Sequence, residues 1–283
     1  MTEADAPLIE VIEFSSADQA ALRRAIGALE TTTLASRITS LLGRQIAIVG
    51  QFVPERLRGS ASHGANIALR AAMGAALRSL REGQRPASSR FHRAALAASG
   101  AAGGALGFAA LPFELPASTI LMLRAIADVA RAQGEDMGSP ETALACLEVF
   151  ALGGRTQADD HLESSYFAIR TLLARSMAEA SRYMIDKGIA DEAAPILVKL
   201  VAKIAARFGV VLSQKFAAQA IPIIGAMGGA AVNMAFLQHF EQIAEAHFTV
   251  RRLERIYGEP FVRAEYERLR MDALRPGTDP SMT

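Results

Sequence analysis

Four basic side chains in the second half of the chain could bind an anion. Lys199, Lys203 and Arg207 recur every four residues, so on a helix they form one stripe that drifts by about 40° per step. Lys215 continues the basic run, and residues 193–240 contain no Asp or Glu. Such a stripe can hold a phosphate or a lipid headgroup, or it can be a solvated helix face.

A second group of residues has the side chains needed for a hydrolase-like polar site. Arg155 and Asp159 lie in a polar loop predicted between two helices, and His239 and His247 lie eight residues apart on a later predicted helix. Imidazole and carboxylate groups are the usual general acids and bases. The alternatives are a helix cap with a surface ion pair in the loop, and hydrogen-bonded core histidines.

The sequence lacks the motifs that commonly mark catalytic or metal centres. It contains no HExxH, GxSxG, Walker or GxGxxG pattern. We therefore expect no metal and no cofactor, and we favour a binding role over an enzymatic one. Cys146 is the only cysteine, which excludes an intrachain disulfide, and its apolar neighbours predict a buried thiol.

The elements that must position these residues are predicted to be helices. Ser139-Pro140-Glu141 is a strong helix start, and Gly153-Gly154 is a suitable end. Similar signals along the chain predict about ten helices, including 34–52 and 90–111, and no convincing strand. We expect an all-α fold with a single multi-helix domain over 16–275. Residues 1–15 would form an N-terminal extension, and 276–283 a disordered tail.

Two long segments carry no formal charge. Residues 94–113 include 13 Ala or Gly among 20, and residues 216–240 include the polar side chains Gln219 and Asn233. Both reach the length of a membrane span. Because Ala and Gly are weakly hydrophobic and allow close helix approach, we favour a central Ala/Gly-rich helix pair. The alternatives are reversible entry into or contact with a membrane, and a true membrane span.

The net charge of +1 hides strongly basic zones. Residues 31–113 carry +8 and residues 193–240 carry +4, and each zone ends in a charge-free segment. Basic residues beside an apolar helix suit an anionic membrane, at about 1 kcal/mol per Lys or Arg. Alternatively, these bases pair with the acidic segment 114–192. We expect no nucleic acid partner, because the bases are not interleaved with aromatic residues.

Several segments resemble the EcsC protein family over about residues 90–270. The segments that carry the resemblance are 147–154, 166–170, 207–222, 225–233, 239–240, 247–248 and 251–258. The resemblance implies a bacterial protein named from an operon that also encodes an ABC transporter. A transporter or another protein is therefore a candidate partner. The resemblance implies no catalytic mechanism, cofactor or substrate.

Taken together, these features predict a cytoplasmic protein, with peripheral attachment to the inner membrane face as an option. The acidic N-terminus is unlike a secretory signal. Our leading hypothesis is binding of a membrane surface or a lipid-like apolar ligand through small-residue helices with basic flanks. The alternatives are the hydrolase-like enzyme and a helical regulatory partner of a transporter. The candidate binding residues are Lys199, Lys203, Arg207, Lys215, Gln219, Asn233, Arg155, Arg170, His239 and His247.

Overall fold

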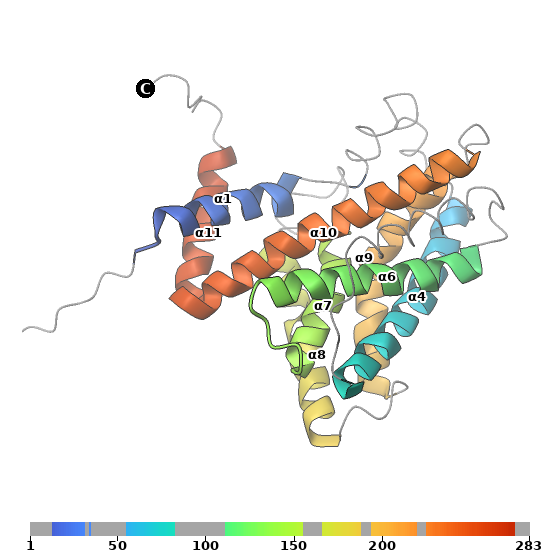
Figure 1. Cartoon of the computed structure of the whole chain (residues 1–283), viewed down its shortest axis with the longest axis horizontal. Coiled ribbons are helices and arrows are strands. Elements are labelled where there is room, and N and C mark those ends of the chain that lie inside the picture. The colour runs from blue at the N-terminus through green and yellow to red at the C-terminus, as the bar shows by residue number, and fades with distance from the viewer. Residues whose placement is uncertain are drawn as a thin grey trace, which may run out of the picture.

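The computed structural model describes residues 13–31, 34, 55–82, 111–154, 166–187, 194–219 and 225–274. These residues form eight α-helices and no strand (Figure 1), which confirms the all-α prediction. The helices are α1 (Ser16–Thr31), α4 (Glu55–Glu82), α6 (Leu111–Ala132), α7 (Pro140–Leu152), α8 (Tyr166–Lys187), α9 (Pro195–Gln219), α10 (Gly225–Tyr257) and α11 (Glu259–Leu274).

The predicted number of about ten helices is too high for the described part of the chain. The predicted helices 34–52 and 90–111 fall largely outside the described residues. So do the first twelve residues of the predicted extension and all of the predicted tail 276–283. The region from Leu111 to Pro116, predicted to separate two helices, instead forms the first turns of α6. Pro112 fits at the second helical position because the first helical N–H groups need no partner within the helix, whereas Pro116 lies inside α6.

The two charge-free segments are only partly described. Residues 94–110 lie outside the described part, so the expected packing of a central helix pair lies outside it too. Of the second segment, residues 216–219 end α9 and residues 225–240 begin α10, while 220–224 lie outside the described part. Among the described helices, none combines the length and the apolar character that crossing a bilayer requires.

Helix α10, with 33 residues, is the longest described helix, and several other helices pack along it (Figure 1). Helix α1 packs along its C-terminal half, and α6 packs on it as well. Gly258, with φ of +87°, ends α10 in the left-handed conformation that glycine adopts readily. The chain then turns into α11, which contacts both α10 and α1.

Helix α7 lies at the centre of the fold, where it packs on α6, α8, α9, α10 and α4. Ten of its 13 residues are buried, as expected for a helix that is apolar on nearly every side. The Ser139 side chain accepts hydrogen bonds from the backbone N–H groups of Glu141 and Thr142, which confirms the predicted start. A Cβ atom on Gly154 would lie 2.7 Å from the backbone oxygen of Arg207. Glycine therefore permits the end of α7 to contact α9 directly.

Four phenylalanine rings fill the space where α7, α9 and α10 meet. Phe150 of α7 lies 5.0 Å from Phe208 of α9 and 5.2 Å from Phe240 of α10, measured between ring centroids. Phe236, one turn before Phe240, completes the group at 5.1 Å from Phe240. All four rings are buried, so this aromatic core fixes α7 relative to α9 and α10.

Candidate functional site

The basic residues of α9 do not form one continuous surface. Lys199 and Lys203 are exposed, and the Lys203 ammonium donates to the Ser176 hydroxyl of α8 at 2.7 Å. Arg207 is half-buried, and its Nε donates to the backbone oxygen of Ala151 at the end of α7. Two of the predicted anion-binding side chains therefore face solvent, while the third supports helix packing.

Lys215 is fully buried, which is incompatible with its predicted place on a basic surface. Its ammonium lies 2.9 Å from Glu114 Oε1 of α6 and 5.3 Å from the centre of the Phe236 ring. Burial lowers the pKa of Lys215, while the charge and hydrogen bond of Glu114 oppose that change. Lys215 is thus one half of an internal ion pair.

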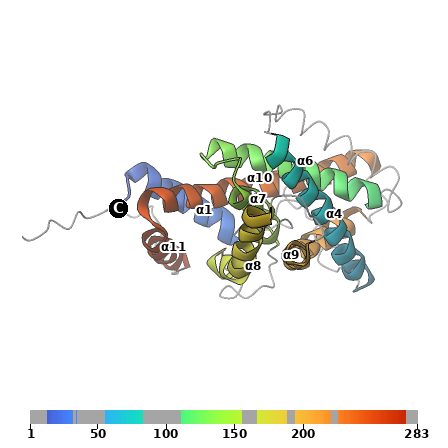
Figure 2. The same ribbon diagram turned by 90° about the horizontal axis from the view of Figure 1, so that it is seen from below.

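An exposed group on α8 joins Lys199 and Lys203, because α8 lies beside α9 (Figure 2). Arg175 is 90% exposed, Leu172 is 60% exposed, and Arg175 Nε lies 2.8 Å from Glu179 Oε1. The hydrogen bond from Arg175 lowers the pKa of Glu179, and the charges of the two lysines contribute. We name Leu172, Arg175, Lys199 and Lys203 the α8–α9 basic face.

The two histidines of the hydrolase-like hypothesis face different partners. His239 Nε2 lies 2.9 Å from the backbone oxygen of Gly153, whereas His247 Nδ1 lies 3.0 Å from the Tyr166 hydroxyl. Both rings are buried, and so is Asn233 on the same helix. The candidates Arg155 and Asp159 fall in residues 155–165, which lie outside the described part. The side chain of Gln219 lies outside it as well.

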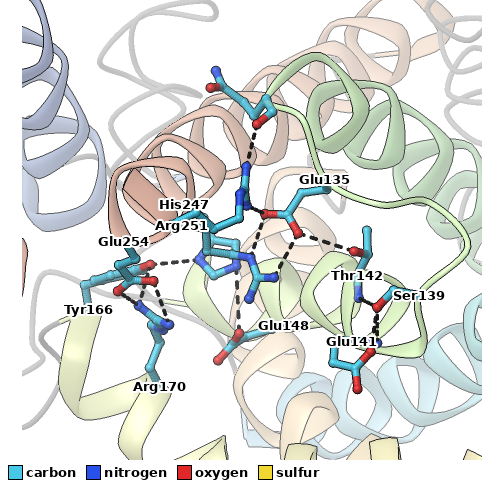
Figure 3. Close-up of polar contacts among 12 residues, drawn as sticks. Glu135, Ser139, Glu141, Thr142, Glu148, Tyr166, Arg170, His247, Arg251 and Glu254 are labelled. Atoms are coloured by element: carbon cyan, nitrogen blue, oxygen red, sulfur yellow. Dashed lines mark hydrogen bonds and ion pairs between the residues drawn. The ribbon is translucent and has the colours of Figure 1, made fainter. Parts of the chain in front are cut away.

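Arg170, a candidate from the family resemblance, lies on one side of a largely buried polar network (Figure 3). Its guanidinium contacts both oxygens of Glu254, at 2.5 and 3.2 Å, and donates to the Tyr166 hydroxyl at 3.3 Å. Because the Tyr166 oxygen accepts from Arg170, its hydrogen is available to His247 Nδ1. In the tautomer where Tyr166 donates to Nδ1, the imidazole proton resides on Nε2. Burial, aided by the nearby arginine charges, lowers the pKa of His247 and keeps it neutral.

Glu135, just before α7, anchors the other side of this network (Figure 3). Arg251 donates to both of its oxygens, at 3.0 and 2.8 Å, and Arg255 and the Thr142 hydroxyl bind it too. Burial opposes the ionisation of Glu135, but the hydrogen bonds and charges of the two arginines lower its pKa. Glu135 is therefore a carboxylate that fixes two arginines of α10.

Glu148 of α7 is the unusual acid in this region. Its side chain is 7% exposed, and the one basic side-chain nitrogen within 4 Å among the described residues is His247 Nε2, at 3.8 Å. Burial raises the pKa of Glu148 to about 7, against the lowering effect of Arg170 and Arg251. A carboxyl group with such a pKa can exchange a proton near neutral pH.

Sequence reasoning missed most of this network. It did not single out Glu135, Tyr166, Arg251 or Glu254, whose interactions depend on helices that are far apart in the chain. Glu148 could have been found, because it is the only charged residue between Thr142 and Leu152. A lone carboxyl group in an apolar helix is either neutral or specifically paired.

A pocket of about 240 Å³ opens beside Glu148. It lies between α7, α8 and the first half of α11, and Arg251 of α10 contributes to it. We call it the Glu148 pocket; the lining residues used below are Leu144, Glu148, Phe167, Arg170, Met177, Arg251 and Arg263. Across the described part of the chain, no three His, Cys, Asp or Glu side chains are grouped to hold a metal.

A model of the EcsC protein family matches residues 18–253. The matched segment contains the whole α8–α9 basic face and most of the Glu148 pocket, but not α11. No curated protein and no solved structure matches the chain.

Proposed function

The chain belongs to the EcsC protein family, and from that starting point we propose that it attaches reversibly to anionic membranes through the α8–α9 basic face. Three exposed cations lie there around one carboxylate, that of Glu179. Each Lys or Arg close to an anionic bilayer contributes about 1 kcal/mol. Insertion of the exposed Leu172 side chain adds about 2 kcal/mol. Because the Glu179 carboxylate offsets one of these charges, the total is about 4 kcal/mol, which gives weak, salt-sensitive attachment.

The substitution Lys199→Glu with Lys203→Glu tests this proposal directly. We expect at least a roughly tenfold loss of binding to vesicles of phosphatidylglycerol and phosphatidylcholine, because two attractive charges become repulsive. Vesicle flotation measures the bound fraction. Wild-type binding should also fall when salt rises from about 0.1 to about 0.5 M, because the added ions screen the exposed charges.

The matched control reverses the same number of charges elsewhere. Arg24 and Arg124 are exposed residues of α1 and α6, so Arg24→Glu with Arg124→Glu should leave flotation nearly unchanged. Equal losses in both double variants would show that only net charge matters, and the proposed face would be abandoned. The proposed face would also be abandoned if vesicle binding did not change with salt concentration.

Glu148 also favours a second candidate function, that of a hydrolase-like enzyme. A carboxyl group with a pKa of about 7 beside a pocket is suited to general base catalysis. It could take a proton from the water that attacks an ester carbonyl and pass that proton to the leaving alcohol. We expect Glu148→Ala to slow hydrolysis of p-nitrophenyl octanoate at least about 100-fold. Equal rates for wild type and variant, measured by p-nitrophenolate absorbance, would eliminate this candidate.

A further inference from the structure

The Glu148 pocket shares no residue with the α8–α9 basic face, and its polar groups point to a ligand of its own. Glu254 and Glu135 are already occupied by Arg170, Arg251 and Arg255. Two more carboxylates line the pocket: Glu141, whose oxygens accept from the Ser139 and Ser181 hydroxyls, and Glu259 at the start of α11.

Around Glu148 itself, two groups can donate hydrogen bonds to a ligand. His247 Nε2 is buried and has no hydrogen-bond partner among the described residues. When Glu148 is protonated, its O–H group becomes a further donor beside Arg251. Buried donors without acceptors cost free energy, so a ligand that supplies acceptor oxygens is favoured.

A cation stands at the outer part of the pocket. Arg263 of α11 is exposed, its guanidinium lies 5.2 Å from the centre of the Phe167 ring, and it pairs with no carboxylate within 4 Å in the described part of the chain. Its charge can attract an anion, and Glu259, one turn earlier on α11, offsets part of that attraction. Arg170 and Arg251 disfavour a cationic group at the inner end of the pocket.

The rest of the lining is mixed. Leu144, Phe167 and Met177 form an apolar patch, and Glu141, Thr171, Ser181 and Glu259 add polar groups. Since one water occupies about 30 Å³ of liquid, the pocket volume corresponds to roughly eight waters. That space suits an oxyanion head and the first part of an alkyl chain, with the rest of the chain outside.

We propose that the Glu148 pocket binds an amphiphile with a carboxylate or phosphate head. The head accepts hydrogen bonds from Glu148, Arg251 and Arg263, and the chain lies on Leu144, Phe167 and Met177. His247 acts as a positioning residue, because its neutral ring faces the Glu148 carboxyl group.

Proton uptake by Glu148 should accompany this binding. The groups facing Glu148 are Tyr166 and Arg170 of α8, and His247, Arg251 and Glu254 of α10. Burial raises the pKa of Tyr166 and lowers that of His247, so both stay neutral, and the arginines stay charged. An ionised Glu148 would repel the anionic head, so affinity falls as pH rises above about 7.

Titration with octanoate, followed by isothermal calorimetry, tests the proposal without any membrane. We expect saturable binding that weakens about tenfold between about pH 6 and about pH 8. Acetate, which lacks the chain, and octyltrimethylammonium, which reverses the charge, should bind far more weakly. Glu148→Gln should bind octanoate with an affinity that no longer depends on pH.

Arginine variants on α11 provide the second measurement. Arg263→Ala should weaken octanoate binding several-fold, whereas Arg268→Ala should not, because Arg268 is exposed on the same helix but pairs with Glu265 and Asp272. Lack of saturable octanoate binding would overturn the proposal, as would equal binding of octyltrimethylammonium. Equal effects of the two arginine variants would also overturn it. If Glu148→Gln does not fold, as judged by circular dichroism, the arginine comparison decides alone.

Discussion

Replacing Lys215 by methionine is expected to lower the free energy of unfolding by about 3–5 kcal/mol. Lys215 is 0% exposed and its partner Glu114 is 4% exposed, with 2.9 Å between Nζ and Oε1. Without the lysine, Glu114 is left as an uncompensated buried charge, or must bind a proton. Glu114 Oε2 already lacks a hydrogen-bond partner among the described residues. Once Oε1 loses Lys215, no contact of Oε2 within the described part of the chain is present to stabilise the carboxylate. Urea unfolding, followed by circular dichroism, measures the loss.

Two further variants distinguish the ion pair from a simple loss of side-chain packing. Adding Glu114→Leu to Lys215→Met should recover most of the lost stability, because no lone charge then remains buried. Lys199→Met removes an exposed lysine from the same helix and should change stability by less than about 0.5 kcal/mol. A double variant as unstable as Lys215→Met alone would show that the buried charge is not the cause.

The free energy of unfolding of Glu148→Gln, relative to that of wild type, is expected to rise by about 3 kcal/mol as the pH increases from about 4.5 to about 8. Burial raises the pKa of Glu148 from 4.5 to about 7, so the folded state holds this proton more tightly than the unfolded state. The stability that this proton provides is fully present below pH 4.5, and it is lost as pH rises through 7. Glutamine does not titrate and so avoids the loss.

Urea unfolding of both proteins across this pH range measures the difference. Glu245→Gln removes an exposed carboxyl group from α10 and should show no comparable gain at high pH. A constant difference between wild type and Glu148→Gln at all pH values would mean that Glu148 ionises as freely in the folded protein as in the unfolded chain. The same result would remove the basis for proton uptake in the Glu148 pocket.

Local signals were sufficient to predict several elements of the fold. Ser139 and Pro140 define the start of α7 because a side-chain acceptor and a fixed φ both act within one turn. The buried state of Cys146 followed from its apolar neighbours, and burial raises the pKa of its thiol to about 12.

Helical spacing was less informative about the basic residues of α9. The drift of about 40° at every fourth residue carries Arg207 about 80° and Lys215 about 160° away from Lys199. The spacing thus already separated Lys215 from the stripe. It did not show that Lys215 would meet Glu114, which lies 101 residues earlier. Periodicity tells which residues share a helix face, but not which element covers that face.

The sequence by itself determined that this protein is helical, where α7 begins and ends, and that one carboxyl group lies within an apolar helix. Only the tertiary structure decided which basic residues are exposed and which groups surround Glu148. Helix formation depends on neighbours within a few residues, whereas burial and charge pairing depend on helices that pack from distant parts of the chain. His247 and Tyr166, 81 residues apart, meet only because α8 and α10 both pack around α7.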